Sequence, residues 1–246
     1  MYNDAIDLAA FYNTALGHTA SRLIRRKVRR IWPNLSGSVI MGMGYATPYL
    51  RPFMSEADRV FAAMPAQQGA TYWPAGALNL TVLCDDGELP LQDSSVDRII
   101  MAHCVECTEQ LRTMLNEAWR VLAGDGRLLV IVPNRRGLWA RFERTPFGHG
   151  QPYSISQLSR LLRDNMFMTS KIECALYIPP YPGRIIIRSA VGIEDLGSRW
   201  LRRLGGVVVV EATKQIYAAS KVRHLERRGR NLVPVSVARV SNVEKY

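Results

Sequence analysis

Short apolar runs alternate with segments of helical periodicity along most of the chain. Five such runs fall at residues 38–41, 59–63, 81–84, 96–102 and 127–132. Strands that are buried on both faces of a parallel sheet read as runs of this kind. Between the last two runs, residues 109–122 place Leu111, Leu115 and Leu122 on one face of an amphipathic helix. Strands that alternate with helices predict an α/β fold with right-handed crossovers.

The two ends of the chain add further elements to this pattern. Near the start, Ala20, Ile24, Val28 and Ile31 recur at helical spacing, and Pro33 ends the pattern. The opposite side carries Arg22, Arg25, Arg26, Arg29 and Arg30. We expect this helix to pack across the sheet with its arginines in solvent, the alternatives being a membrane surface or nucleic acid.

After residue 133 comes a polar loop rich in Gly and Pro, followed by a helix over residues 156–163 with Ser154 as its N-cap and Gln157 three residues later. Residues 169–178 and 206–218 are expected to be strands, joined by a helical segment over residues 185–204. The predicted division of the chain is a basic helix in residues 1–35, a central domain in residues 36–218 and a polar, basic tail in residues 219–246.

Composition and charge narrow the class of protein. A chain of 246 residues with 48% hydrophobic content is long enough for one sizeable domain. The net charge of +11 is concentrated in residues 22–30 and 223–230, arms that suit RNA, anionic lipid or an acidic protein. No apolar run approaches the roughly 20 residues that span a bilayer. With four cysteines and no leader-like start, we expect a cytoplasmic protein without a membrane span.

The stretch VIMGMGYATPYL, residues 39–50, is typical of a ligand-binding turn after a first strand. Gly42 and Gly44 lie where a backbone without Cβ atoms lets a ligand approach closely. Ala46 occupies the place of a third glycine, and a β-carbon there is unfavourable only if the position needs a positive φ. A dinucleotide site is disfavoured, because no carboxylate for a ribose follows.

One block resembles a known family closely. Residues 94–134 read SSVDRIIMAHCVECTEQLRTMLNEAWRVLAGDGRLLVIVPN and are similar to the fourth strand, helix and fifth strand of class I, type 11 S-adenosylmethionine-dependent methyltransferases. Asp97 opens the strand, His103 follows it, and W-R-V-L at residues 119–122 precedes the turn Gly124–Gly126. Upstream, DDGELPL from Asp85 resembles the family's D-A-E-x-L-P-F segment. The resemblance runs from about residue 36 to 218.

The resemblance implies the fold, the cofactor and the site. The expected fold is Rossmann-like: a seven-stranded, mostly parallel sheet with an antiparallel last strand and helices on both faces. The implied cofactor is S-adenosylmethionine, with Asp85 where the family contacts adenine. The implied cofactor-binding residues are Gly42, Met43, Gly44, Tyr45, Ala46, Met64, Asp85, Asp86, Gly87 and His103.

Three positions depart from the family pattern. Ile40 replaces an Asp, Ala46 a Gly, and Met64 the acid that holds the ribose hydroxyls. A hydrogen bond to a charged group contributes about 1.5 to 3 kcal/mol, so its loss weakens binding by roughly ten- to a hundredfold. Gln67 and Gln68 follow directly and offer neutral partners to the ribose. We therefore expect a degenerate cofactor site.

Candidates for catalysis are few, because methyl transfer from a sulfonium needs a base only when the acceptor must lose a proton. His103 is the first candidate for a base or orienting group, and His149 is the second; both have structural roles as alternatives. Aromatic and arginine side chains interleave over residues 135–153 and suit an aromatic or anionic acceptor. Cys104 and Cys107 are expected to be buried thiols, and no metal site is predicted.

These inferences favour an S-adenosylmethionine-dependent methyltransferase that acts on a small-molecule acceptor. One alternative is a non-catalytic member of the fold that serves as a binding or assembly partner, since the motif acids are missing. The other is an RNA methyltransferase whose basic arms contact the phosphate backbone.

Overall fold

A computed structural model of the chain describes residues 2–215. The predicted tail and the second basic arm lie outside the described residues. Within residues 2–215, no helix combines the length and apolarity needed to cross a membrane.

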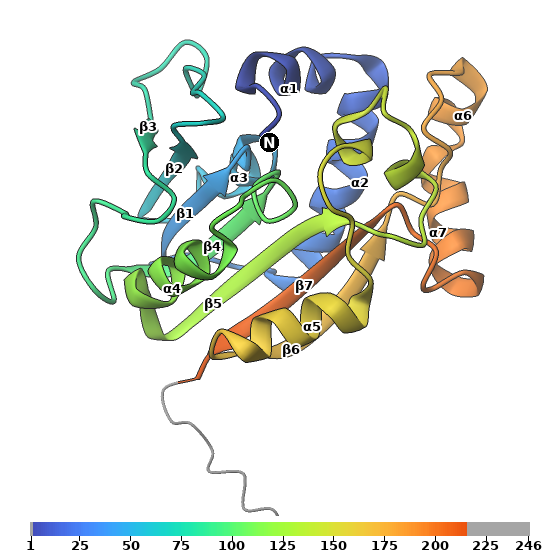
Figure 1. Ribbon diagram of the computed structural model, residues 1–246. Helices are drawn as coiled ribbons and strands as arrows, with labels where there is room; N and C mark the ends of the chain where they lie inside the picture. The colour runs from blue at the N-terminus through green and yellow to red at the C-terminus, as the bar shows by residue number, and fades with distance from the viewer. Residues whose placement is uncertain (1, 216–246) are drawn as a thin grey trace, which may run out of the picture. The chain divides into compact units, whose positions relative to one another are not determined.

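Seven strands form one sheet in the order β3-β2-β1-β4-β5-β7-β6 (Figure 1). The strands are β1 Val39–Gly44, β2 Arg59–Pro65, β3 Thr81–Cys84, β4 Val96–Ala102, β5 Leu122–Pro133, β6 Phe167–Ala175 and β7 Val207–Lys214. The first five run parallel, whereas β7 is antiparallel to both of its neighbours. This arrangement confirms the predicted mostly parallel sheet with an antiparallel last strand. The chain leaves β1 toward β2 and later returns to β4 on its other side, so the switch point of the sheet lies at the end of β1.

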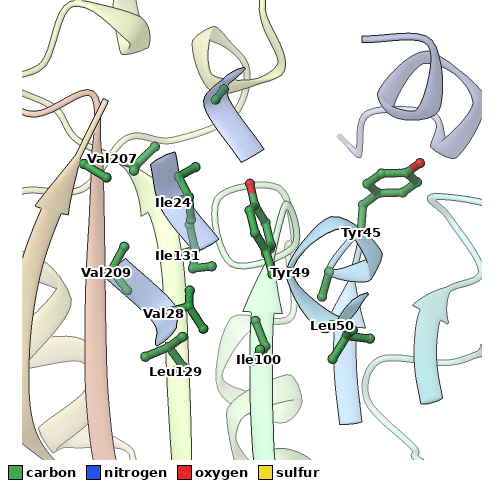
Figure 2. Close-up of a cluster of buried hydrophobic side chains, with 14 of the residues drawn as sticks. Ile24, Val28, Tyr45, Tyr49, Leu50, Ile100, Leu129, Ile131, Val207 and Val209 are labelled. Carbon is green, nitrogen blue, oxygen red and sulfur yellow. The ribbon is translucent and has the colours of Figure 1, made fainter. Parts of the chain in front are cut away.

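Helices cover both faces of this sheet. The α-helices are α1 Ala5–Tyr12, α2 Ala15–Ile31, α3 Thr47–Leu50, α4 Leu111–Val121, α5 Ile155–Asp164, α6 Arg184–Arg188 and α7 Ala190–Trp200. Alternate residues of the central strands point to opposite faces and enter two separate apolar clusters, one with α1 to α3 and the other with α4 and α5. Figure 2 shows Ile24 and Val28 of α2 beside Leu129 and Ile131 of β5 and Val209 of β7.

The N-terminal region contains two helices where the sequence pattern indicated one. Asp4 caps α1 by accepting a hydrogen bond from the Ile6 amide at 2.7 Å. Helix α2 follows after Asn13 and Thr14, and a side chain at Gly17 would overlap the backbone of Phe11 and Tyr12. Glycine at this position therefore lets the two helices approach closely. The predicted helical segment over residues 185–204 is also divided, into α6 and α7 at Ser189.

An ion pair fastens α2 to the turn before β2. The two terminal guanidinium nitrogens of Arg29 donate to Glu56 at 2.6 Å, and Glu56 also accepts from the Leu35 amide at 3.0 Å. Hydrogen bonds from Arg29 hold the pKa of Glu56 below its usual value. The Arg29 side chain is 41% exposed, so solvent screens the pair and limits its contribution to about 1 kcal/mol or less.

We expect Glu56→Gln to lower the free energy of unfolding by up to about 1 kcal/mol at neutral pH. A depressed carboxyl pKa stabilises the fold above the unfolded-state pKa of about 4.3, and this contribution is lost as the pH falls below it. Urea unfolding between about pH 7 and about pH 3.5 measures the effect, with exposed Glu143→Gln as the control. A difference that stayed constant across this range would contradict the assignment to the ionised pair.

Candidate functional site

The loop after β1 requires glycine at Gly44. Its φ is +72°, and a Cβ there would overlap the carbonyl oxygen of Ala102 and lie 2.8 Å from Cys104 Cβ. The backbone of β1 therefore lies directly against the end of β4. The adjacent Met43 and Tyr45 are buried.

Gly42 and Ala46 pack against each other and against α3. A Cβ on Gly42 would lie 2.9 Å from Ala46 Cβ and 2.6 Å from a Leu50 methyl group. Ala46 has a φ of −91°, which any residue adopts without strain. Its replacement of the family's third glycine therefore carries no backbone penalty. The other departure at the same strand, Ile40, is fully buried in the apolar cluster of α1 to α3.

The ends of β2 and β3 contribute one apolar and several polar groups. Met64 is fully buried in the same apolar cluster, so it offers no partner to a ribose. Gln68 is 1% exposed and donates to the His103 carbonyl at 2.8 Å. Asp85 is exposed and accepts from the amide of Gly87, which is half-buried, at 2.8 Å.

Asp86, the neighbour of Asp85, is buried. It accepts hydrogen bonds from the Tyr2 hydroxyl at 2.5 Å and from the Thr108 hydroxyl at 3.0 Å. The buried carboxylate of this turn is therefore Asp86 rather than Asp85. Its partners tie the turn after β3 to the N-terminal segment and to the loop after β4.

His103 lies at the centre of the site, immediately after β4. It is 2% exposed, and its φ of +55° lies in the left-handed region, which is uncommon for residues other than glycine. A hydrogen bond of 2.7 Å joins its Nε2 atom to the hydroxyl of Tyr12, which is hydrogen-bonded to the hydroxyl of Tyr49 at 2.6 Å. The Nδ1 atom lies 3.5 Å from a carboxylate oxygen of buried Glu106. Burial raises the pKa of Tyr12 and of Tyr49, so both hydroxyls stay protonated at neutral pH.

Three buried polar atoms of this region lack a hydrogen-bond partner. They are Oε1 of Gln68, Nδ1 of His103 and Oε2 of Glu106. Buried polar groups are nearly always paired, because an unpaired one carries a desolvation penalty of about 1 to 3 kcal/mol. These three atoms cluster at the switch point of the sheet, where open α/β sheets bind their ligands.

The N-terminal segment, residues 2–12, occupies part of this region, and Figure 1 shows α1 beyond the ends of β1 and β4. Tyr2 bonds to Asp86, the Ala5 amide donates to the Gln68 carbonyl at 2.8 Å, and Tyr12 bonds to His103. The Tyr12 ring also stacks on Tyr45, with centroids 5.7 Å apart and planes 14° from parallel. The N-terminal segment therefore contacts the loops after β1, β2, β3 and β4.

His149, the second predicted catalytic residue, is exposed in the loop between β5 and α5. The structure does not bring its side chain into the hydrogen-bond network of His103. In the same loop, Trp139 and Phe147 are buried, and the Phe147 ring lies 5.0 Å from the His103 ring. The arginines of the loop, Arg135, Arg136, Arg141 and Arg144, are exposed.

Cys104 and Cys107, which follow His103, are both buried. The Cys104 thiol donates to the Met43 carbonyl at 3.5 Å, and burial raises its pKa well above the usual value. Burial also raises the pKa of Cys107 to about 12. Within residues 2–215, no group of three His, Cys, Asp or Glu side chains is arranged to hold a metal ion.

Known proteins resemble this chain in sequence over one segment and in fold. Residues 41–130 match the sequence model of a methyltransferase domain family. No curated protein matches the sequence.

Solved structures share the fold at low sequence identity. An S-adenosylmethionine-dependent methyltransferase of Thermotoga maritima superposes with a TM-score of 0.59 at 16% identity, over 86% of this chain and 96% of that one. A Haloferax volcanii methyltransferase, solved with the activator Trm112, gives 0.55 at 16% identity over 85% and 91%. The 1,6-didemethyltoxoflavin N1-methyltransferase of Burkholderia thailandensis, solved with its substrate and S-adenosylhomocysteine, gives 0.52 at 15% identity over 82% and 79%.

Residues 41–130 thus resemble the methyltransferase domain family, and the whole sheet has the class I, Rossmann-like fold of the solved methyltransferases. Sequence reasoning selected the loops after β1, β2, β3 and β4 but missed Tyr12, Tyr49 and Glu106. Tyr12 had a visible signal, because Ala5, Leu8 and Tyr12 recur at helical spacing after the capping residue Asp4.

Proposed function

We propose that this protein is an S-adenosylmethionine-dependent methyltransferase that acts on a small-molecule acceptor through a degenerate cofactor site. The observation that carries the proposal is the set of unpartnered buried atoms of Gln68, His103 and Glu106 at the switch point of the sheet. A ligand with hydroxyl, amino and carboxylate groups has the donors and acceptors to satisfy them. The match over residues 41–130 and the fold support the same reading.

Each loop would hold one part of the cofactor. Gly44 holds the loop after β1 against the end of β4 at the switch point. Asp85, Asp86 and Gly87 offer polar groups to the adenine, and Gln68 offers an amide to the ribose. Met43, Tyr45, Ala46 and His103 complete the set, and Met64 contributes only apolar surface. When bound, the cofactor supplies an electrophilic methyl group on a sulfonium.

His103 is the residue best placed to accept a proton from the acceptor. The carboxylate of Glu106 lies 3.5 Å from Nδ1, and Nε2 bonds to the Tyr12 hydroxyl, so Nε2 is the atom that becomes available when Tyr12 moves away. A base is needed only for acceptors that lose a proton during transfer. His149, exposed in the loop after β5, stays a secondary candidate for contact with the acceptor.

The N-terminal segment must move before a cofactor can reach these groups. Tyr2 and Tyr12 take up hydrogen-bonding atoms of Asp86 and His103, and the Tyr12 ring covers Tyr45. The apparent affinity equals the intrinsic affinity multiplied by the fraction of molecules in which the segment is displaced. We therefore expect binding that is weaker than the missing ribose acid alone would produce.

The same segment favours a second function, that of a non-catalytic member of the fold that acts as a binding or assembly partner. Asp86 and the Nε2 atom of His103 are already hydrogen-bonded to the chain's own tyrosines, so these two groups do not need a cofactor as a partner. The methyltransferase of Haloferax volcanii, which shares this fold, was solved in a complex with an activator protein. Cofactor binding separates the two functions.

Isothermal titration with S-adenosylhomocysteine tests the proposal. We expect saturable binding and a rise in melting temperature, because ligand at 100 times its Kd adds about 2.7 kcal/mol of stability. Asp85→Asn is expected to weaken binding about tenfold, since it removes a charged acceptor but keeps an oxygen for the Gly87 amide. Exposed Glu88→Gln removes a carboxylate from the same turn and should leave binding unchanged. No heat and no melting shift at millimolar ligand would sink the methyltransferase proposal and leave the non-catalytic function.

A further inference from the structure

A large basic cavity lies beside the edge strand β6. Its volume is about 810 Å³, within the range of about 300 to 1,000 Å³ that is usual for small-molecule sites. The walls come from α2, β6, α7, the loop after β5 and the start of α5. In sequence these segments lie far apart, so the cavity is a product of the tertiary fold.

Six cationic side chains line this cavity, against two carboxylates. The cations are Lys27, Arg30, Arg136, Arg199, Arg202 and Arg203. Lys27 is only 5% exposed and lies 3.5 Å from Glu173, one of the two carboxylates. The second carboxylate, Asp195, lies 3.8 Å from Arg26, which is not one of the residues that line the cavity. Within residues 2–215, none of the five arginine side chains of the lining forms an ion pair or a hydrogen bond.

The start of α5 adds backbone donors to the same wall. Ser154 and Gln157 form a capping box, and Ser154, Ile155 and Ser156 line the cavity. The capping box satisfies the amides of Ser154 and Gln157, whereas the amides of Ile155 and Ser156 have no acceptor among the described residues. A helix N-terminus with unpaired amides attracts anions. Guanidinium groups bind phosphate through two parallel hydrogen bonds, which adds geometric fit to charge.

We infer that this cavity binds a phosphate-bearing ligand with at least two negative charges. The site is distinct from the candidate cofactor site. In the sheet, β6 is three strands away from β4, which corresponds to roughly 14 Å at the usual strand spacing. None of the residues assigned to the cofactor site lines the cavity. The inference therefore does not rest on methyl transfer.

A free phosphate compound and a phospholipid headgroup share this chemistry. Exposed apolar side chains of α7 and of the turn after it flank the cavity's arginines. They are between 48% and 81% exposed and belong to Leu196, Trp200, Leu201 and Leu204. Exposed Trp and Leu beside arginines suit the surface of an anionic membrane. Both sources are accordingly tested with the same variants.

The full chain is titrated calorimetrically with inorganic pyrophosphate and tested separately for co-sedimentation with phosphatidic acid vesicles. The test variant is the double substitution Arg199→Ser and Arg202→Ser, both at exposed side chains of the lining. The matched control, Arg112→Ser with Arg163→Ser, removes two exposed arginines from α4 and α5 outside the cavity. We expect binding of the test variant to weaken tenfold or more, while the control stays within about twofold of the unchanged protein.

If pyrophosphate binds and only the test variant weakens its binding, the ligand is a soluble phosphate compound. If only vesicles bind and only the test variant weakens that binding, the ligand is a lipid headgroup. Absence of binding to both probes would overturn the inference. So would equal weakening in the two double variants, because general charge and not the cavity would then explain it. Binding to single-stranded RNA alone would also contradict it.

Discussion

Replacing Gly44 by alanine is expected to destabilise the fold by about 2 to 5 kcal/mol. Two independent terms add here. A left-handed backbone conformation is unfavourable for a residue with a Cβ by about 1 to 2 kcal/mol, and Gly44 has a φ of +72°. The new Cβ would also overlap the Ala102 carbonyl oxygen, and overpacking of a tight interior adds about 1 to 3 kcal/mol. Urea unfolding of the variant measures the sum.

Gly37 offers a matched control for the first term. Its φ is +74°, yet nothing lies within 4 Å of the position that its Cβ would take. Gly37→Ala should therefore lose only about 1 to 2 kcal/mol. The difference between the two variants isolates the contact between β1 and the end of β4. Equal losses would show that this contact relaxes without penalty and that the turn is less tightly packed than the structure indicates.

The second large effect concerns the variant Tyr12→Ala, which is expected to lose stability and to gain affinity for the ligand. Tyr12→Ala removes an almost fully buried ring and two hydrogen bonds, so we expect a loss of stability of about 3 to 5 kcal/mol. The same change frees His103 Nε2 and uncovers Tyr45. Affinity for S-adenosylhomocysteine is therefore expected to rise about tenfold, since about 1.4 kcal/mol of competition is removed. Calorimetry and thermal unfolding on the same sample measure both.

Phe167→Ala is the comparison that separates release of the site from simple damage. Phe167 is fully buried in the cluster on the other face of the sheet, and its loss should destabilise the fold to a similar extent. Phe167 is not among the residues assigned to the candidate site, so the affinity of this variant for the ligand should stay unchanged. If Tyr12→Ala weakened binding instead, the N-terminal segment would have to be a part of the binding site and not its competitor.

The sheet was predictable because its signals are local and repeated. Each parallel strand is an apolar run, and Asp97, which the family resemblance placed at the start of the fourth strand, accepts a hydrogen bond from the Val39 amide at 2.8 Å. That contact fastens the start of β4 to β1. The absence of a backbone penalty at Ala46 was not predictable from the sequence, because the penalty depends on the φ angle and an alanine can adopt several φ values.

The network around His103 was less accessible to sequence reasoning. Tyr12, Tyr49 and Glu106 are separated along the chain and meet only through the fold, and no local pattern relates them. Lys27 shows the same limit. It lies in a run of six cations that reads as a solvated helix face, yet it is 5% exposed because α2 packs against the edge of β6.

The position of α1 also has a consequence for kinetics. A ligand that can enter only after the N-terminal segment has left cannot associate faster than that segment opens. The observed association rate would therefore rise with ligand concentration and then level off at the opening rate, whereas an open site would show a linear increase. Substitutions that loosen α1, such as loss of the Asp4 cap, should raise that plateau. The speed of this protein would then be set at residues 2–12, outside the strands and loops that carry its chemistry.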